Sequence, residues 1–340
     1  MTAPSRPAGE PLLSVRGLTI DLPGDPGQRG LVEDVTFDVH RGRSLALIGE
    51  SGCGKSLTSM AALRLLPPGL PVRSGSVLFD GVDLLRCRPR ELRAVRGGPV
   101  GIVFQEPMSS LNPTMTVGDQ IAEARRLHLG ESRRAAHRRA IELLERVGIP
   151  NAGQRVRSYP HELSGGMQQR VMIAGAIACD PKLVIADEPT TALDVTIQAE
   201  ILQLLRDLQR DMDLAVLLVT HDLGVVADFC DDVVVMYAGH VVERTSIDGL
   251  FYDPQHPYSS ALLAAVPQSG SPRTRLNVIP GRVPPAGRFP DGCRFRPRCG
   301  HDLPELCARP QVDAELEHGH RTRCGRVSGG ELTLEGVARV

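Results

Sequence analysis

The stretch Gly49–Ser56 reads GESGCGKS and directly follows RSLALI, an apolar run with the composition of a buried strand. The stretch fits the pattern G-x-x-x-x-G-K-[ST], in which backbone N–H groups converge on phosphate oxygens. The helix-like SLTSMAALRLL comes next, so the motif lies in the strand–loop–helix context that it requires. The sequence therefore predicts a phosphate-binding loop.

Two residues at the end of this loop carry specific chemistry. Lys55 is one of only two lysines in a chain that otherwise uses arginine, and its compact charge suits the β- and γ-phosphates of ATP. The Ser56 hydroxyl is expected to bind Mg²⁺. Cys53 is expected to fill space, because no base neighbours it. The loop residues expected to contact the nucleotide are Gly49, Glu50, Ser51, Gly52, Cys53, Gly54, Lys55 and Ser56.

The run LVIADE, Leu183–Glu188, is a second apolar strand, and it ends in two adjacent carboxylates. We expect Asp187 to coordinate Mg²⁺ through water and Glu188 to polarise the water that attacks the γ-phosphate. A third apolar run, LAVLLVT, follows after the helix-like TIQAEILQLLRDLQRDM. This strand–helix–strand order is typical of a parallel sheet, so the core is expected to be α/β.

The segment LSGGMQQR, Leu163–Arg170, resembles the signature motif of ABC-type ATPases. The resemblance implies that its serine and glycines bind the γ-phosphate of an ATP molecule held by a partner subunit. It also implies that Gln105 in IVFQEP senses Mg²⁺ and the attacking water, and that His221 in LLVTHD contacts the γ-phosphate. Nucleotide contacts outside the phosphate-binding loop are then Ser164, Gly165, Gly166, Gln168 and Asp194, the last in Ala192-Leu193-Asp194.

The same resemblance assigns the reaction to a small set of polar groups. The expected catalytic residues are Glu188, His221 and Gln105. The expected Mg²⁺ ligands are Ser56, Gln105 and Asp187. One position departs from the family pattern, because Leu22 stands where an aromatic ring usually stacks on adenine. A leucine packs but cannot stack.

The expected fold is an α/β P-loop NTPase (RecA-like) core with an N-terminal antiparallel β layer. The runs LLSVRGLTIDL and VEDVTFDV predict that layer, and helical patterns over about 106–180 predict an inserted α-helical subdomain. We expect the nucleotide-binding domain to span 1–250. The Pro- and Gly-rich segment 251–340 is expected to form a small irregular extension that contains clustered cysteines.

The tail segment FYDPQHPYSSALLAAVP, Phe251–Pro267, closely resembles the C-terminal extension of dipeptide and oligopeptide permease ATPases. The resemblance implies an ATPase that drives import of such peptides. Nickel or another small solute is an alternative cargo, because related importers share parts of the extension. A soluble ABC ATPase acting on DNA or ribosomes is the alternative from a different class. Within the tail, His256 and Tyr258 are expected to dock the extension rather than to catalyse.

Four of the eight cysteines crowd into the last fifth of the chain: Cys293, Cys299, Cys307 and Cys324. Their spacing is neither the paired C-x-x-C of a zinc ribbon nor a common ferredoxin pattern. In a reducing compartment, clustered thiols favour a metal site over disulfides. Peptide-permease ATPases with a matching tail hold a [4Fe–4S] cluster, and the resemblance implies one here. Zinc held by these thiols or by His301 and His320, and reduced structural thiols, are the alternatives.

The 340 residues carry a net charge of −1 and no tryptophan. This composition favours a globular protein without a polyanionic partner, so we expect no nucleic acid to bind. The basic run Arg125–Arg139 is expected to be a solvated helix face. No apolar run reaches the roughly 18–20 residues of a spanning helix, and the N-terminus lacks the pattern of a signal peptide.

The resemblance also implies partners and a location. The expected partners are a second ABC ATPase subunit that is a different chain, two transmembrane permease subunits and an extracytoplasmic substrate-binding protein. The segment EPMSSLNPTMTVGDQI resembles the groove in which importer ATPases receive a permease's coupling helix. We therefore expect a peripheral protein on the cytoplasmic face of the cell membrane. The expected cofactors are ATP, Mg²⁺ and the [4Fe–4S] cluster.

Overall fold

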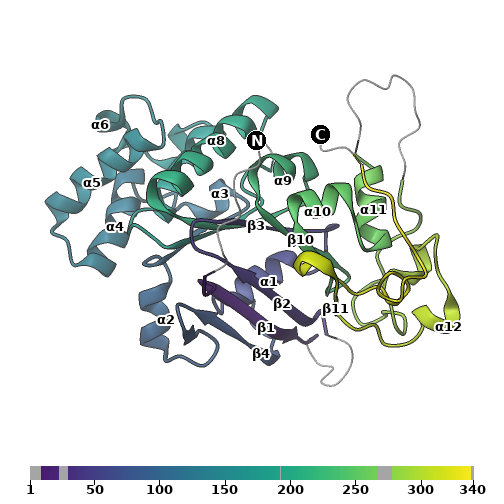
Figure 1. The fold of residues 1–340 in the computed structure, drawn as a ribbon. Helices are drawn as coiled ribbons and strands as arrows, with labels where there is room; N and C mark the ends of the chain where they lie inside the picture. The colour runs from purple at the N-terminus through teal and green to yellow at the C-terminus, as the bar shows by residue number, and fades with distance from the viewer. Residues whose placement is uncertain (1–8, 23–29, 192, 267–277, 338–340) are drawn as a thin grey trace. The chain divides into compact units, whose positions relative to one another are not determined.

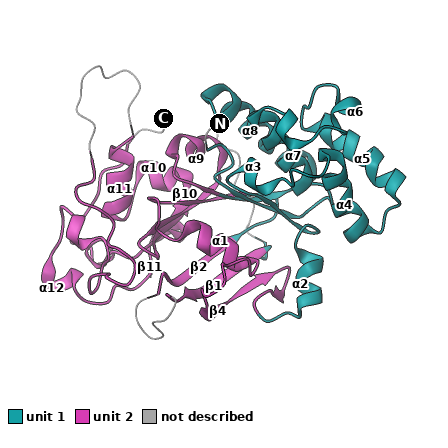
Figure 2. Cartoon of the chain, turned by 180° about the vertical axis from the view of Figure 1, so that it is seen from behind, with its two compact units in different colours: residues 1–12, 39–43, 86–218 teal, residues 13–38, 44–85, 219–340 magenta. Residues whose placement is uncertain are grey.

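The computed structural model describes residues 9–22, 30–191, 193–266 and 278–337. The chain forms two compact units, which Figure 2 shows in two colours. Unit 1 comprises residues 1–12, 39–43 and 86–218, and unit 2 comprises residues 13–38, 44–85 and 219–340. The C-terminal extension, green to yellow in Figure 1, thus folds within the unit that also contains the phosphate-binding loop.

The antiparallel sheet expected near the N-terminus is present in unit 2, with the strand order β2-β1-β4-β5. Its strands are β1 (Leu13–Ile20), β2 (Val32–Val39), β4 (Val72–Phe79) and β5 (Val82–Asp83). β1 pairs antiparallel with β4, in a register that places Leu13 opposite Phe79 and Val15 opposite Val77. These four side chains are buried, so the apolar positions of the two strands share one face of the sheet.

The strand before the phosphate-binding loop is β3 (Ser44–Ile48), and all five of its residues are buried. It pairs in parallel with β9 (Asp232–Tyr237), which pairs antiparallel with β10 (His240–Ser246). The extension adds β12 (Arg321–Thr322) beside β10, and β11 (Ala314–Glu315) beside β12. The extension therefore continues the sheet that carries the loop, and it covers the edge of β10.

The helical elements of unit 2 are short. They are α1 (Lys55–Ala62), α9 (Leu223–Phe229), α10 (Ile247–Tyr252), α11 (Pro257–Ala264), η2 (Arg296–Arg298), α12 (Pro304–Cys307), η3 (Glu317–Gly319) and α13 (Gly325–Ser328). The extension has a small apolar cluster of its own, in which Leu316 and Leu332 pack against Cys324, Val327 and Leu334. It is therefore more regular than its Pro- and Gly-rich composition predicts.

Unit 1 contains the strands β6 (Val100–Val103), β7 (Leu183–Asp187) and β8 (Ala215–Thr220), in the order β8-β7-β6. β6 and β7 are parallel, and the parallel orientation expected for β7 and β8 from their strand–helix–strand order stays a prediction. Its helical elements are α2 (Pro89–Val95), α3 (Pro107–Ser110), α4 (Val117–Leu129), α5 (Arg133–Arg146), α6 (Ala152–Arg155), η1 (Pro160–Glu162), α7 (Gly165–Ala176) and α8 (Val195–Met212). Polar side chains cap four of them: Thr116 caps α4, Ser132 caps α5, Ser164 caps α7 and Asp194 caps α8.

Candidate functional site

The phosphate-binding loop joins β3 to α1, and three of its glycines have positive φ angles. These angles are 147° at Gly49, 79° at Gly52 and 101° at Gly54. A Cβ atom at Gly49 would lie 2.1 Å from the carbonyl oxygen of Met236 in β9, so only glycine fits there. The loop leads into the N-terminus of α1, where backbone N–H groups and the helix dipole favour an anion.

Lys55 begins α1, and its side chain lies inside the loop. Nζ donates hydrogen bonds to the carbonyl oxygens of Gly49, at 2.7 Å, and of Glu50, at 3.2 Å. It also lies 3.9 Å from Sγ of Cys53. Burial raises the pKa of the Cys53 thiol, so this thiol is neutral at pH 7 and suits the expected role of a space-filling residue.

Two residues of the C-terminal extension contact Glu50 in the phosphate-binding loop. The backbone N–H of Glu50 donates to the hydroxyl oxygen of Tyr258 at 2.8 Å. Nη1 of Arg298 donates to both carboxylate oxygens of Glu50, each at 2.9 Å. Sequence reasoning does not find these contacts, because they join residues 208 and 248 positions apart.

His256 and Tyr258 anchor helix α11. His256 is buried, and burial lowers its pKa to about 3, so the imidazole is neutral. Its Nδ1 accepts a hydrogen bond from the backbone N–H of Tyr258 at 3.1 Å, as a helix cap does. The Tyr258 ring packs against Tyr237 and Phe295, with ring centroids 4.6 and 5.3 Å apart. These contacts agree with a docking role for the two residues.

The carboxylate pair predicted at the end of β7 lies in unit 1. Asp187 is buried, whereas the Glu188 side chain is partly accessible. Oε2 of Glu188 accepts hydrogen bonds from Nε2 of Gln105 and from Oγ1 of Thr191, each at 2.9 Å. The fold thus brings two of the predicted catalytic residues together across 83 positions of sequence. It adds Thr191, which a sequence pattern could only have suggested through its place three residues after Glu188.

The signature segment forms the start of α7. The Ser164 side chain caps this helix by accepting a hydrogen bond from the backbone N–H of Met167 at 3.4 Å. Ser164 and Gly165 are exposed, and nothing lies within 4 Å of a Cβ atom placed at Gly165. Gln168 is buried instead, and its Nε2 donates to the carbonyl oxygens of Pro160 and Leu163 at 2.8 and 3.2 Å. A nucleotide contact by Gln168 therefore stays a prediction.

Three further residues with predicted nucleotide contacts are Asp194, His221 and Leu22. Asp194 caps α8, where its Oδ1 accepts from the backbone N–H of Ile197 at 2.9 Å, and Ala192 lies outside the described residues. His221 is exposed directly after β8. Leu22 lies beside the extension, because a Cβ atom at Gly287 would come within 3.1 Å of its Cδ1. The contacts of Asp194, His221 and Leu22 with a nucleotide stay predictions.

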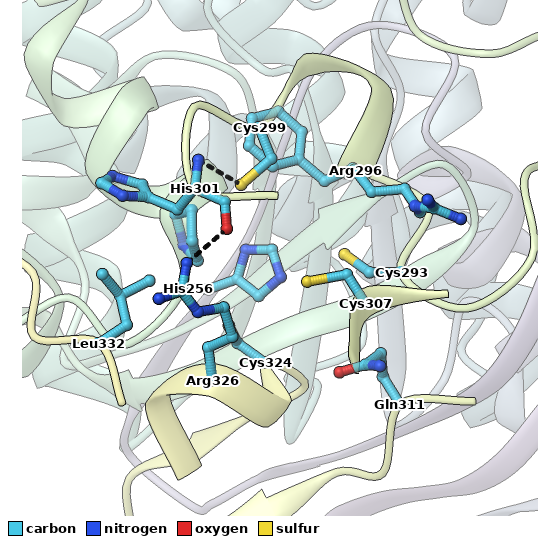
Figure 3. Close-up of a pocket in the computed structure, with 12 residues that line it drawn as sticks. His256, Cys293, Arg296, Cys299, His301, Cys307, Gln311, Cys324, Arg326 and Leu332 are labelled. Atoms are coloured by element: carbon cyan, nitrogen blue, oxygen red, sulfur yellow. Dashed lines mark hydrogen bonds between the residues drawn. The ribbon is translucent and has the colours of Figure 1, made fainter. Parts of the chain in front are cut away.

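The four clustered cysteines line one pocket of the extension (Figure 3). The backbone N–H groups of His301 and Leu303 donate to Sγ of Cys299 and of Cys307, each at 3.4 Å. Burial raises the pKa of Cys293 to about 12 and of Cys299 to about 11, so both are neutral thiols at pH 7. Within the described ranges, no three His, Cys, Asp or Glu side chains are arranged to hold a metal ion.

The two histidines considered as alternative zinc ligands differ in their position relative to the four-cysteine pocket. His301 lines the four-cysteine pocket together with Arg296 and Arg326. His320 does not line it, and its Nε2 lies 2.8 Å from Oε1 of the buried Glu243. The structure therefore weakens the case for His320 as a ligand of this pocket.

Unit 1 also has an apolar groove, between the segment after β6 and helix α7. Its lining includes Phe104, Leu111, Ile121 and Met172, with Gln120 as a polar member. The segment EPMSSLNPTMTVGDQI contributes Ser110, Leu111, Gln120 and Ile121 to the lining of this groove. Among the described helices, none is long and apolar enough to span a bilayer.

Comparisons with known proteins identify the family of this chain. The family model described as ABC transporter matches residues 32–191, and the model described as oligopeptide/dipeptide transporter, C-terminal region, matches residues 242–307. A putative peptide import ATP-binding protein of Brucella abortus is 48% identical over 92% of this chain and 94% of the relative. The oligopeptide transport ATP-binding protein OppD of Bacillus subtilis is 50% identical over 86% and 82%, respectively.

Solved structures confirm the fold class. The dimeric post-hydrolysis structure of the ATP-binding cassette MJ0796, bound to ADP and Pi, is 26% identical with a TM-score of 0.61, covering 69% of this chain and 98% of that one. CbiO1 of Clostridium perfringens is 28% identical with a TM-score of 0.60, over 71% and 91%. The chain therefore belongs to the ABC transporter family, as an ATP-hydrolysing subunit whose C-terminal region is of the oligopeptide/dipeptide transporter type.

Proposed function

We propose that this ATPase is the motor subunit of an importer for dipeptides or oligopeptides. One observation carries the proposal: a single chain combines a region that matches the ABC transporter family with a C-terminal region of the oligopeptide/dipeptide transporter type. The relatives named for peptide import or peptide transport extend over both parts. A nickel importer or an ATPase acting on nucleic acid has no comparable support.

In the proposed reaction, Glu188 polarises the water that attacks the γ-phosphorus. Gln105 and Thr191 both donate to Oε2 of Glu188, so they orient the carboxylate. Lys55 offsets charge that develops on the transferred phosphoryl group. Ser56, Gln105 and Asp187 stay the predicted Mg²⁺ ligands, and Mg²⁺ would offset the negative charge of the phosphates.

The signature is proposed to act on ATP held by a second nucleotide-binding domain. The exposed start of α7 offers the backbone N–H groups of a first helical turn and the positive end of a 12-residue helix, which suit a phosphate. Two ATP molecules at the interface would close the pair, and hydrolysis would reopen it. We propose that the second nucleotide-binding domain belongs to a different ATPase chain.

The apolar groove of unit 1 is proposed to receive the coupling helix of a permease. Its apolar lining would bury the nonpolar face of a short helix, and Gln120 at its rim could fix the orientation. Two permeases and an extracytoplasmic substrate-binding protein would complete the importer. This arrangement places the chain on the cytoplasmic face of the membrane.

We further propose a [4Fe–4S] cluster in the four-cysteine pocket. Four thiols in one pocket match the usual ligand number, and the N–H groups of His301 and Leu303 are directed at two of the sulfurs. Arg296 and Arg326 in the lining would offset the negative charge of the ligated cluster. The thiols would lose their protons on loading, and the cluster would then fix the short elements around it.

Anaerobic purification tests the cluster. We expect brown protein that absorbs broadly near roughly 400 nm and contains about four irons per chain. Cys307→Ser should lose most of the iron, while Cys87→Ser, outside the pocket, should retain it. Colourless wild-type protein with one zinc per chain would show that the assignment is wrong.

Co-purification from native membranes tests the motor function. A tag on this chain should recover a second ATPase, two permeases and a peptide-binding protein, and the complex should hydrolyse ATP faster when peptide and binding protein are added. Recovery of ribosomes or DNA without permeases would contradict the transport function. A nickel-binding protein in place of the peptide-binding one would change the cargo but keep the motor.

A further inference from the structure

We infer that Arg298 and Tyr258 are positioning residues of the phosphate-binding loop, through which the C-terminal extension sets nucleotide affinity. Both residues and the loop lie in unit 2. Both contact Glu50, a position that the phosphate-loop pattern leaves open. The inference concerns ATP binding by the chain itself, and it does not depend on the cargo.

Glu50 is held by the extension at two points and is linked to Lys55 at a third. Tyr258 accepts from its backbone N–H at 2.8 Å, and Arg298 donates to both carboxylate oxygens at 2.9 Å. The carbonyl oxygen of Glu50 accepts from Nζ of Lys55 at 3.2 Å. A displacement of Glu50 therefore moves a hydrogen-bond acceptor of the lysine that is expected to bind the phosphates.

The arginine itself is held firmly. Its side chain is only 5% exposed. Nε donates to the carbonyl oxygen of Pro280 at 2.8 Å, and the guanidinium carbon lies 5.7 Å from the centre of the Tyr237 ring. Arg298 closes the 3₁₀ turn Arg296–Arg298. A buried, multiply bonded guanidinium loses little further freedom when it pairs with a carboxylate, so the pair is rigid.

The charge of Glu50 links its contact with Arg298 directly to nucleotide affinity. Without a partner, the Glu50 carboxylate would place a negative charge in a loop that must receive negatively charged phosphates. Arg298 neutralises this charge and holds it toward the extension. Tyr258 keeps its proton at neutral pH, because burial raises its pKa, so its hydroxyl stays an uncharged acceptor.

Nucleotide affinity of the full-length chain, measured with a fluorescent ATP analogue and Mg²⁺, tests the inference. Arg298→Gln should weaken binding about tenfold, because it leaves the carboxylate unpaired. The double variant Glu50→Gln with Arg298→Gln should bind more tightly than Arg298→Gln alone, because the repelling charge is gone. Arg321→Gln, which removes an arginine paired with Asp313 elsewhere in the extension, should bind like the wild type.

The outcomes distinguish a residue that positions the phosphate-binding loop from one that only stabilises the fold. A folded Arg298→Gln variant with wild-type affinity contradicts the inference, and so does a double variant that binds no better than the single one. Tyr258→Phe provides a second test in case Arg298→Gln does not fold. It removes only the acceptor of the Glu50 N–H and should weaken binding severalfold with little change in melting temperature, whereas unchanged affinity would count against the inference.

Discussion

Glu188 combines a rare backbone conformation with two side-chain hydrogen bonds. Its φ angle is +46°, in the left-handed region that non-glycine residues seldom adopt. Such a conformation is maintained where the surroundings fix it, and Gln105 and Thr191 fix the carboxylate here. The residue is therefore oriented before any nucleotide arrives, as the water-polarising role requires.

Glu188→Gln should retain ATP binding but lose most turnover. The amide keeps the shape of the side chain yet cannot polarise the attacking water, and loss of a general base costs about 10²–10⁴-fold in rate. Steady-state ATPase assays on the assembled complex, together with nucleotide affinity, measure both effects. A variant that hydrolyses ATP at the wild-type rate would refute the role of Glu188.

Thr191→Val should slow hydrolysis less severely. The substitution removes the hydroxyl that donates to Oε2 of Glu188 but leaves the hydrogen bond from Gln105. The loss of one hydrogen bond, worth about 0.5–1.5 kcal/mol, corresponds to a drop in kcat of about two- to twelvefold. KM for ATP should stay near the wild-type value, and a change confined to KM would argue against an orienting role for Thr191.

At the scale of elements, short contiguous patterns were predictable and long-range contacts were not. The phosphate-binding loop, the strand ending in Asp187 and the start of α7 each follow from a few adjacent residues. β11 and β12 have two residues each, too few to show a strand period. The contact of Arg298 with Glu50 depends on how the extension folds back onto the loop, which no local pattern encodes.

The helix pair α4 and α5 also makes a long-range contact that its local sequence does not predict. Most of the basic side chains in this segment are at least partly accessible, as a solvated face predicts, but Arg125 is buried. Its Nε donates to Glu131 at 2.9 Å, and its Nη1 donates to the carbonyl oxygen of Ala178. Arg125 thus ties the α4–α5 connection to the segment after α7.

Glu131→Gln should lower the free energy of unfolding at pH 7 by about 1–2 kcal/mol. The hydrogen bond from Arg125 lowers the pKa of Glu131 below its usual 4.5. The carboxylate therefore stabilises the fold above pH 4.5, and this contribution is lost as the pH falls through the lowered value. Urea denaturation at several pH values measures it.

The matched control for this pair is Glu142→Gln. Its partner Arg139 and Glu142 itself are 35% and 57% exposed, so the substitution should change the free energy of unfolding by less than about 0.5 kcal/mol. If Glu131→Gln proves equally mild, or if its effect persists unchanged at pH 3, the partly buried Arg125–Glu131 pair does not stabilise unit 1 as described.

At the scale of the whole molecule, the nucleotide motifs and the apolar groove differ in their chemical character. The nucleotide motifs occupy strand ends and helix starts, whereas the apolar groove of unit 1 is lined largely by nonpolar side chains. Such a groove suits a partner helix rather than a charged substrate. The cargo pocket is expected in other subunits, so the proposed function gives this chain control over when transport occurs rather than over what is transported.

Phe104→Arg should reduce recovery of the permeases at least tenfold. Phe104 lines the groove and is 37% exposed, so an arginine there would place an unpaired charge against the docked helix. Leu127→Arg is the control, because Leu127 is 75% exposed and does not line the groove. Co-purification from membranes compares the two, and equal recovery would place the docking surface elsewhere.

Peptide uptake by the reconstituted complex tests the central claim most directly. Proteoliposomes that contain the permeases, both ATPases and the binding protein would be supplied with a labelled peptide outside and ATP with Mg²⁺ inside. The account predicts ATP-dependent accumulation with the wild-type chain and less than about a tenth of that rate with Glu188→Gln. Equal uptake by the two complexes, or ATP hydrolysis that peptide never stimulates, would contradict it.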